Sequence, residues 1–270
     1  MSSDKDMLLV GSNLDELFSE KEKRKDDGHS VTCMTISKAQ HMVNHGSLFF
    51  KHIIDEGRLV EGSKNKYRGI IKGWKAASNY QNEINANAEL FELLSYLPKT
   101  QLGILTATDI VIISIRNILI RKFASLGLYV FSWEQVSNTA VNFNYIDLNE
   151  RIILLHARQI KNFYRQGYNL QLSIYFFEKL LGILCKIVGE KINYNFANKK
   201  EILQLHENFN DGSYKQLRGI ELLCAYYGFE SSPQEFIKWI RDPNYFCATQ
   251  GPNKAFYQTG RDVACYGACW

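Results

Sequence analysis

Hydrophobic positions recur with helical spacing over the C-terminal two thirds of the chain but form short runs before it. From about residue 82 onward, apolar residues repeat every three or four positions between clear helix start and stop signals. Between residues 31 and 80, short apolar runs alternate with glycines, which is typical of short strands or brief helices joined by turns. The pattern predicts a mainly α protein with a helical C-terminal lobe and a smaller mixed α/β N-terminal lobe.

Capping residues set the expected bounds of the helices. Thr106 and Asp109 have the spacing of a capping box, which would begin a helix that runs to Gly127. Asp147 and Glu150 predict the same motif for a helix that ends near residue 167. Glycine or proline stops predict further helices over residues 170–188, 214–227 and 232–243. Four asparagines are interpreted as turn and capping residues before a helix at residue 89: Asn79, Asn82, Asn85 and Asn87.

The chain divides into three unequal parts. Residues 1–30 mix many acidic and basic side chains and are predicted to form a charged arm or a docking helix. Residues 31–98 make up the small mixed lobe, and residues 99–270 make up the helical lobe. Because the C-terminal tail is rich in aromatic residues, we expect the terminal segments to dock on the body of the protein or on a second copy, giving a homo-oligomer.

Composition adds limits on the class of protein. The 270 residues are 46% hydrophobic and 22% charged, as in globular domains. The first ten residues do not resemble a secretory signal, and the most apolar stretch, Ile104–Ile120, is interrupted by Asp109 and Arg116. We therefore expect a buried soluble helix there and no membrane span. Six scattered cysteines favour free thiols in a reducing, cytoplasmic location.

The net charge of +4 is placed unevenly along the chain. The segment Gly62–Tyr80 contains no acidic residue and carries +5, so the remainder sums to −1. Basic groups interleaved with aromatic rings suit single-stranded nucleic acid, because cations contact phosphates and rings stack on bases. The alternative is a solvated hairpin whose tryptophan packs in the core. The candidate binding residues in this segment are Lys64, Lys66, Tyr67, Arg68, Lys72, Trp74 and Lys75.

A second basic feature is predicted on the helix after Asp147. At 100° per residue, Arg151, Arg158, Lys161 and Arg165 share a stripe about 80° wide. The opposite side carries Ile152, Ile153, Ile160 and Phe163 and is expected to be buried. Such a stripe would follow a phosphate backbone, or its cations would pair with acids elsewhere in the fold.

Arg151 and His156 form the pattern R-x4-H, which is similar to the short Arg/His motif of HEPN-type ribonucleases. That resemblance implies an all-helical RNA-cleaving enzyme in which these two residues act on the phosphodiester. By helical projection His156 falls on the expected apolar face, which favours a core residue over a catalyst.

Other sites find less support in the sequence. His29, Cys33, His41 and His45 have spacings compatible with zinc, but surface histidines are the simpler interpretation, so no metal and no cofactor are predicted. Phosphate loops, dinucleotide-binding glycines, nucleophile elbows and the strand-helix-strand alternation of nucleotide-binding α/β folds are not found.

These observations lead to one function and two alternatives. The sequence favours a non-catalytic, nucleocapsid-like protein that binds single-stranded RNA or another phosphate polymer without sequence specificity, in a groove between the two lobes. A scaffold module with an acidic partner and the HEPN-like ribonuclease are the alternatives.

Overall fold

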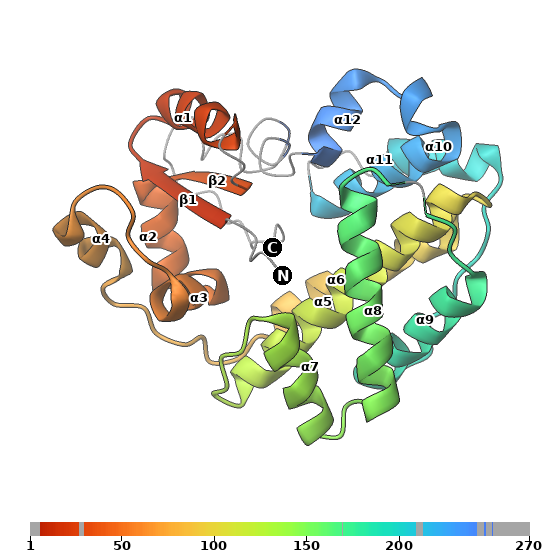
Figure 1. The fold of residues 1–270 in the computed structure, drawn as a ribbon, viewed down its shortest axis with the longest axis horizontal. Coiled ribbons are helices and arrows are strands. Elements are labelled where there is room, and N and C mark those ends of the chain that lie inside the picture. The colour runs from red at the N-terminus through yellow and green to blue at the C-terminus, as the bar shows by residue number, and fades with distance from the viewer. Residues whose placement is uncertain are drawn as a thin grey trace. The chain divides into compact units, whose positions relative to one another are not determined.

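The computed structural model describes residues 6–26, 30–168, 170–208 and 213–241, together with Phe246 and Gln250. The described chain divides into two compact units (Figure 1). Unit 1 contains the described residues up to Ser78, and unit 2 contains those from Asn79 to Phe246. The sequence-based boundary near residue 98 therefore falls inside unit 2.

Unit 1 begins with a single strand-helix-strand unit. Strand β1 (Asp6–Gly11) and strand β2 (Ser30–Thr35) pair in parallel, with Met7 opposite Val31, and helix α1 (Leu14–Asp26) connects them. The stretch expected to be a charged arm thus contains β1 and α1, and the statement that no strand-helix-strand alternation occurs was wrong for these residues. Three further helices complete unit 1: α2 (Ile36–Asn44), α3 (Leu48–Glu56) and α4 (Lys64–Ile71).

The core of unit 1 lies between the sheet and helices α2 to α4. Met34, Ala39, Val43 and Phe50 are buried together, and partly buried residues of β1, α3 and α4 pack around them. Trp74, just after α4, belongs to this outer layer. A small sheet is stabilised by such packing, because two paired strands alone are marginal in water.

Unit 2 is built around the long helix α6 (Gln101–Ser125), which contacts at least six other described helices of the unit. Among the described helices, α6 is long and apolar enough to cross a membrane. However, 89% of its most apolar 18-residue stretch is buried inside the protein. Around it lie α5 (Gln81–Ala88), the 3₁₀ helix η1 (Glu89–Tyr96), α7 (Trp133–Asn142), α8 (Leu148–Arg165), α9 (Ile174–Val188), α10 (Lys199–Asn208), α11 (Tyr214–Tyr227), the short 3₁₀ helix η2 (Phe229–Ser231) and α12 (Gln234–Arg241).

Most helix bounds agree with the capping signals. Asp147 and Glu150 form the predicted capping box at the start of α8. Gly189 and Gly228 have φ of 85° and 87° directly after α9 and α11, where a residue without Cβ is least strained. The expected start of α6 was wrong, because Thr100 caps that helix and Thr106 is a buried residue inside it.

The asparagine-rich stretch was also misinterpreted. Asn82, Asn85 and Asn87 lie inside α5 rather than in a turn. Asn87 is buried, where it donates to Glu83 O at 2.7 Å and accepts from Asn117 of α6 at 3.2 Å. The helical fold class with a small mixed N-terminal region is nevertheless as predicted.

Candidate nucleic-acid interface

Helix α4 and the residues directly after it present five basic side chains of unit 1 to solvent. The helix begins at Lys64 because the Ser63 side chain caps it by accepting a hydrogen bond from Lys66 N at 3.4 Å. All five cations of this segment are exposed. We call this group the basic patch, and its members are Lys64, Lys66, Arg68, Lys72 and Lys75.

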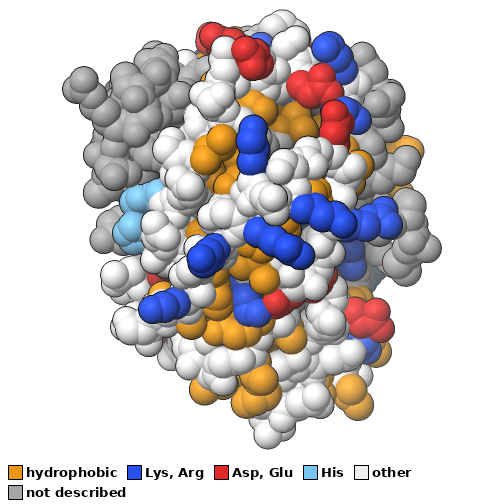
Figure 2. All heavy atoms as spheres, turned by 90° about the vertical axis from the view of Figure 1, so that its left-hand side faces the viewer, with side chains coloured by type: hydrophobic (Ala, Val, Ile, Leu, Met, Phe, Trp, Pro, Cys, Tyr) orange, Lys and Arg blue, Asp and Glu red, His pale blue; other side chains and the backbone are white. Residues whose placement is uncertain are grey.

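The basic patch is not neutralised by carboxylates. None of its five cations forms an ion pair or a side-chain hydrogen bond to another residue within the described chain. Figure 2 shows Lys and Arg side chains gathered across the middle of one face, with most of the acidic side chains towards its edges. Cations without partners keep their full attraction for phosphate groups.

The two aromatic residues proposed for binding, Tyr67 and Trp74, are only half-buried, and Trp74 has a structural role. Its Nε1 donates a hydrogen bond to Ser47 O at 2.9 Å, and the Lys51 ammonium lies 5.4 Å from the ring centroid. The ring also packs against the core of unit 1. Trp74 therefore packs as the alternative stated, but the expected hairpin was wrong, because residues 64–71 form helix α4. Tyr67 is the remaining candidate for base stacking.

The buried face of α8 is not the one expected from the sequence. Ile152 and Phe163 are 62% and 47% exposed, and His156 is exposed as well. The residues that pack inward are Leu154, Ala157, Ile160 and Tyr164. The expected apolar face was therefore wrong for Ile152 and Phe163, whereas Ile160 is buried as expected. Because α8 carries large apolar residues on both sides, helical periodicity alone did not identify the buried one.

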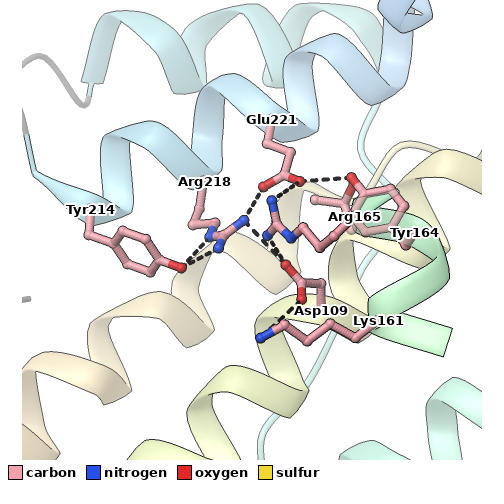
Figure 3. A network of polar contacts seen from close by, with 8 residues as sticks. Asp109, Lys161, Tyr164, Arg165, Tyr214, Arg218 and Glu221 are labelled. Carbon is pink, nitrogen blue, oxygen red and sulfur yellow. Dashed lines mark hydrogen bonds and ion pairs between the residues drawn. The ribbon is translucent and has the colours of Figure 1, made fainter. Parts of the chain in front are cut away.

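In this orientation of α8, two cations of the stripe lie next to buried carboxylates. Lys161 and Arg165 point towards Asp109 of α6, and Arg165 also reaches Glu221 of α11 (Figure 3). Arg218 of α11 contacts both carboxylates. We call these five residues the charge cluster. Pairing with acids elsewhere in the fold, the stated alternative for the stripe, thus applies to Lys161 and Arg165.

Hydrogen bonds with two tyrosines complete the charge cluster. The Tyr164 hydroxyl donates to Glu221 Oε1 at 2.8 Å and lies 2.8 Å from Thr106 Oγ1, and the Tyr214 hydroxyl accepts from Arg218 Nε at 2.8 Å. Such hydrogen bonds offset part of the cost of burying charged groups.

Burial and neighbouring charges shift the pKa values of the cluster. Burial lowers the pKa of Lys161 to about 7, and repulsion from Arg218 and Arg116 adds to this effect. Burial by itself would raise the pKa of Glu221, but the positive charges of Arg165 and Arg218 hold it below its usual range. Burial also raises the pKa of Tyr164, so this phenol remains a hydrogen-bond donor at neutral pH.

The remaining residues of the stripe and of the R-x4-H pattern form fewer polar contacts with described residues. Arg151 is half-buried, and its Nε has no hydrogen-bond partner among the described residues. Arg158 is half-buried and forms no ion pair with any described residue. His156 makes an edge-to-face contact with Phe176 of α9, with ring centroids 5.3 Å apart.

Two of the histidines considered for zinc lie beside each other on α2 and its C-terminal end. The His41 and His45 ring centroids are 4.0 Å apart, and the His45 Nδ1 lies 2.8 Å from His41 O. The buried Cys33 thiol faces Leu17 O at 3.4 Å, and His29 lies outside the described residues. In the part of the chain that the structure describes, no group of three metal-binding side chains occurs.

Comparison with known proteins gives no independent indication of function: no family model, curated protein or solved structure matches this chain.

The basic patch belongs to unit 1 and the stripe to unit 2, so the single groove that was expected to join them stays a prediction. Sequence reasoning missed Asp109, Arg218 and Glu221 as partners of the stripe. The charges within otherwise apolar helical stretches were the available signal, because a buried charge requires a partner.

Proposed function

We propose that the protein binds single-stranded RNA, or another phosphate polymer, through its phosphate groups and without base specificity. The basic patch of α4 is the main contact surface. The observation that carries this proposal is the set of five exposed cations within twelve residues, none of them paired with a carboxylate in the described chain. Exposed lysines and arginines of this kind bind phosphates by releasing condensed counterions.

The arrangement favours backbone contact over base recognition. The eight residues of α4 extend about 12 Å, a length suited to a few successive phosphates. Trp74 is held by the Ser47 carbonyl and the core, so its ring contributes packing rather than a free stacking surface. A non-catalytic structural role in coating RNA, as in a nucleocapsid, is the form of this activity that we propose.

Salt dependence of RNA binding tests the proposal. Binding of a fluorescent oligouridine to the full chain is measured by anisotropy across a salt series. For single strands, log K falls with log salt by about 0.7 per phosphate contact. The variant Lys64→Gln/Lys66→Gln/Lys72→Gln should therefore lower the slope by about 2, if each lysine contacts one phosphate.

A matched control separates the basic patch from net charge. Lys99, Lys191 and Lys200 are exposed lysines of unit 2, and the triple variant to glutamine removes the same charge. We expect this control to keep the wild-type slope. An equal loss in both variants, or no binding at low salt, contradicts the proposal. Tighter binding of polyglutamate than of oligouridine would instead favour the scaffold with an acidic partner.

A further inference from the structure

The charge cluster of unit 2 contains three cations and two carboxylates. Asp109 Oδ2 is contacted by Arg165 and, at 3.3 Å, by Arg218. Glu221 receives Tyr164 and Arg165 at Oε1 and Arg218 at Oε2. Two arginines therefore already neutralise two carboxylates, and Lys161 is additional.

The Lys161 ammonium has no hydrogen-bond partner within the described residues. Its Nζ lies 3.9 Å from Asp109 Oδ1, which is too far for a hydrogen bond, and this buried oxygen also lacks a partner in the described chain. The Lys161 side chain is 25% exposed, so part of it reaches solvent beside the cluster. An ammonium in this position requires an acceptor from outside the protein, water or a ligand.

Further positive charge surrounds this lysine. The groups that act on it from α6 are Asp109 and Arg116, and those from α11 are Arg218 and Glu221. On α8 itself Arg158 lies one turn before Lys161, and Arg165 lies one turn after it. Four arginines and one lysine thus lie around two carboxylates, which is a positive excess. Burial is the main cause that lowers the pKa of Lys161 to about 7, and repulsion from Arg218 and Arg116 adds to it.

We propose that Lys161, Arg158 and Arg165 form a binding site for a single phosphate monoester group on the surface of unit 2. The three side chains project from about 10 Å of one helix, on successive turns. Lys161 donates from its ammonium, Arg158 supplies an unpaired guanidinium, and Arg165 is held in place by Asp109 and Glu221. A doubly charged phosphate matches the positive excess better than a singly charged phosphodiester does.

This site is independent of the proposed RNA contact, which lies in unit 1. The phosphate monoester belongs either to a free nucleotide or to the phosphorylated end of a nucleic acid, and the two sources share the same recognition chemistry. Binding of either ligand favours the charged form of Lys161 and raises the pKa of that ammonium.

Competitive acetylation of the full chain tests the site directly. Lysine acetylation by a limiting reagent is followed peptide by peptide, by mass spectrometry at pH 7.5 in a sulfonate buffer. Lys161 should react faster than the exposed Lys191, and 10 mM inorganic phosphate should slow Lys161 severalfold while leaving Lys191 unchanged. Equal Lys161 reactivity with and without phosphate overturns the proposal.

Repeating the acetylation with different ligands distinguishes a free nucleotide from the phosphorylated end of a nucleic acid. Slowing by a nucleoside 5′-monophosphate identifies a free-nucleotide site, and slowing only by an oligoribonucleotide with a 5′-phosphate identifies a strand-end site. Equal slowing by the 5′-hydroxyl oligoribonucleotide means that internal phosphodiesters bind, which overturns the monoester assignment. The variant Arg158→Gln, at a half-buried position outside the cluster contacts, should reduce the phosphate effect while the circular dichroism of the chain stays unchanged.

Discussion

Arg165 and Asp109 lie 56 residues apart in the sequence, and their side chains form an ion pair where α8 packs on α6. Arg218 of α11 contacts the same carboxylate, so three helices meet at one buried aspartate. Such a junction contributes specificity to the packing of helices, because α8 cannot rotate or slide without leaving a buried charge unpaired. The charge cluster therefore explains why α8 buries Tyr164 rather than Phe163.

Removal of this carboxylate should be strongly destabilising. Asp109→Asn leaves Arg165 and Arg218 with one buried acid between them, and breaking a buried pair of this kind costs about 3–5 kcal/mol. We expect urea unfolding, followed by circular dichroism, to show a loss of that size. Asp55→Asn is the control, since its ion pair with Lys51 is partly solvated and is expected to contribute less than about 1 kcal/mol. Similar losses in both variants would show that the cluster contributes no more than a surface pair.

Lys161 should make stability depend on pH between about 7 and 10. Its pKa is about 7 in the folded protein, against 10.5 for an ordinary lysine, so the unfolded chain binds the extra proton in this window. Stability then rises with pH, with a slope from this group of up to about 1.4 kcal/mol per unit, and the full cost of burying the charge is present below pH 7.

The variant Lys161→Met isolates that contribution. The difference in unfolding free energy between variant and wild type should favour the variant at pH 6 and diminish towards pH 9, in a buffer free of phosphate. The exposed Lys191→Met variant should show a difference that does not change with pH. A pH-independent difference for Lys161→Met would mean that this lysine titrates normally.

Trp74 should matter for the stability of unit 1 and not for RNA affinity. Trp74→Phe removes the hydrogen bond to Ser47 O and should cost about 1 kcal/mol, while Trp74→Ala also removes core packing and should cost about 3–5 kcal/mol. Oligouridine binding by Trp74→Phe should match the wild type. A marked loss of affinity with unchanged stability would show that the indole stacks on bases after all.

The sequence predicted those features that depend on local interactions. The capping box of Asp147 and Glu150 and the glycine after α11 act within a few residues, so their outcome does not depend on the rest of the fold. The exposure of the α4 cations follows from the same kind of local pattern. The partners of Lys161 and Arg165 lie 52 or more residues away in sequence, and a single sequence gives no indication of which distant helix packs on α8.

Replacing two helical glycines by alanine should change the stability of the protein in opposite directions. A Cβ at Gly103, near the start of α6, would lie 2.2 Å from Pro98 O, so the backbone must shift to accept it. Gly182 in α9 has nothing within 4 Å of the same position. Gly103→Ala should therefore destabilise the protein by about 1–3 kcal/mol, and Gly182→Ala should stabilise it by about 0.5–1 kcal/mol, because alanine restricts the unfolded chain and favours the helix. Thermal unfolding followed by circular dichroism measures both changes. If Gly103→Ala were as stable as Gly182→Ala, the close approach of Pro98 to α6 would have to be wrong, since no flexible side chain is available there to relieve the contact.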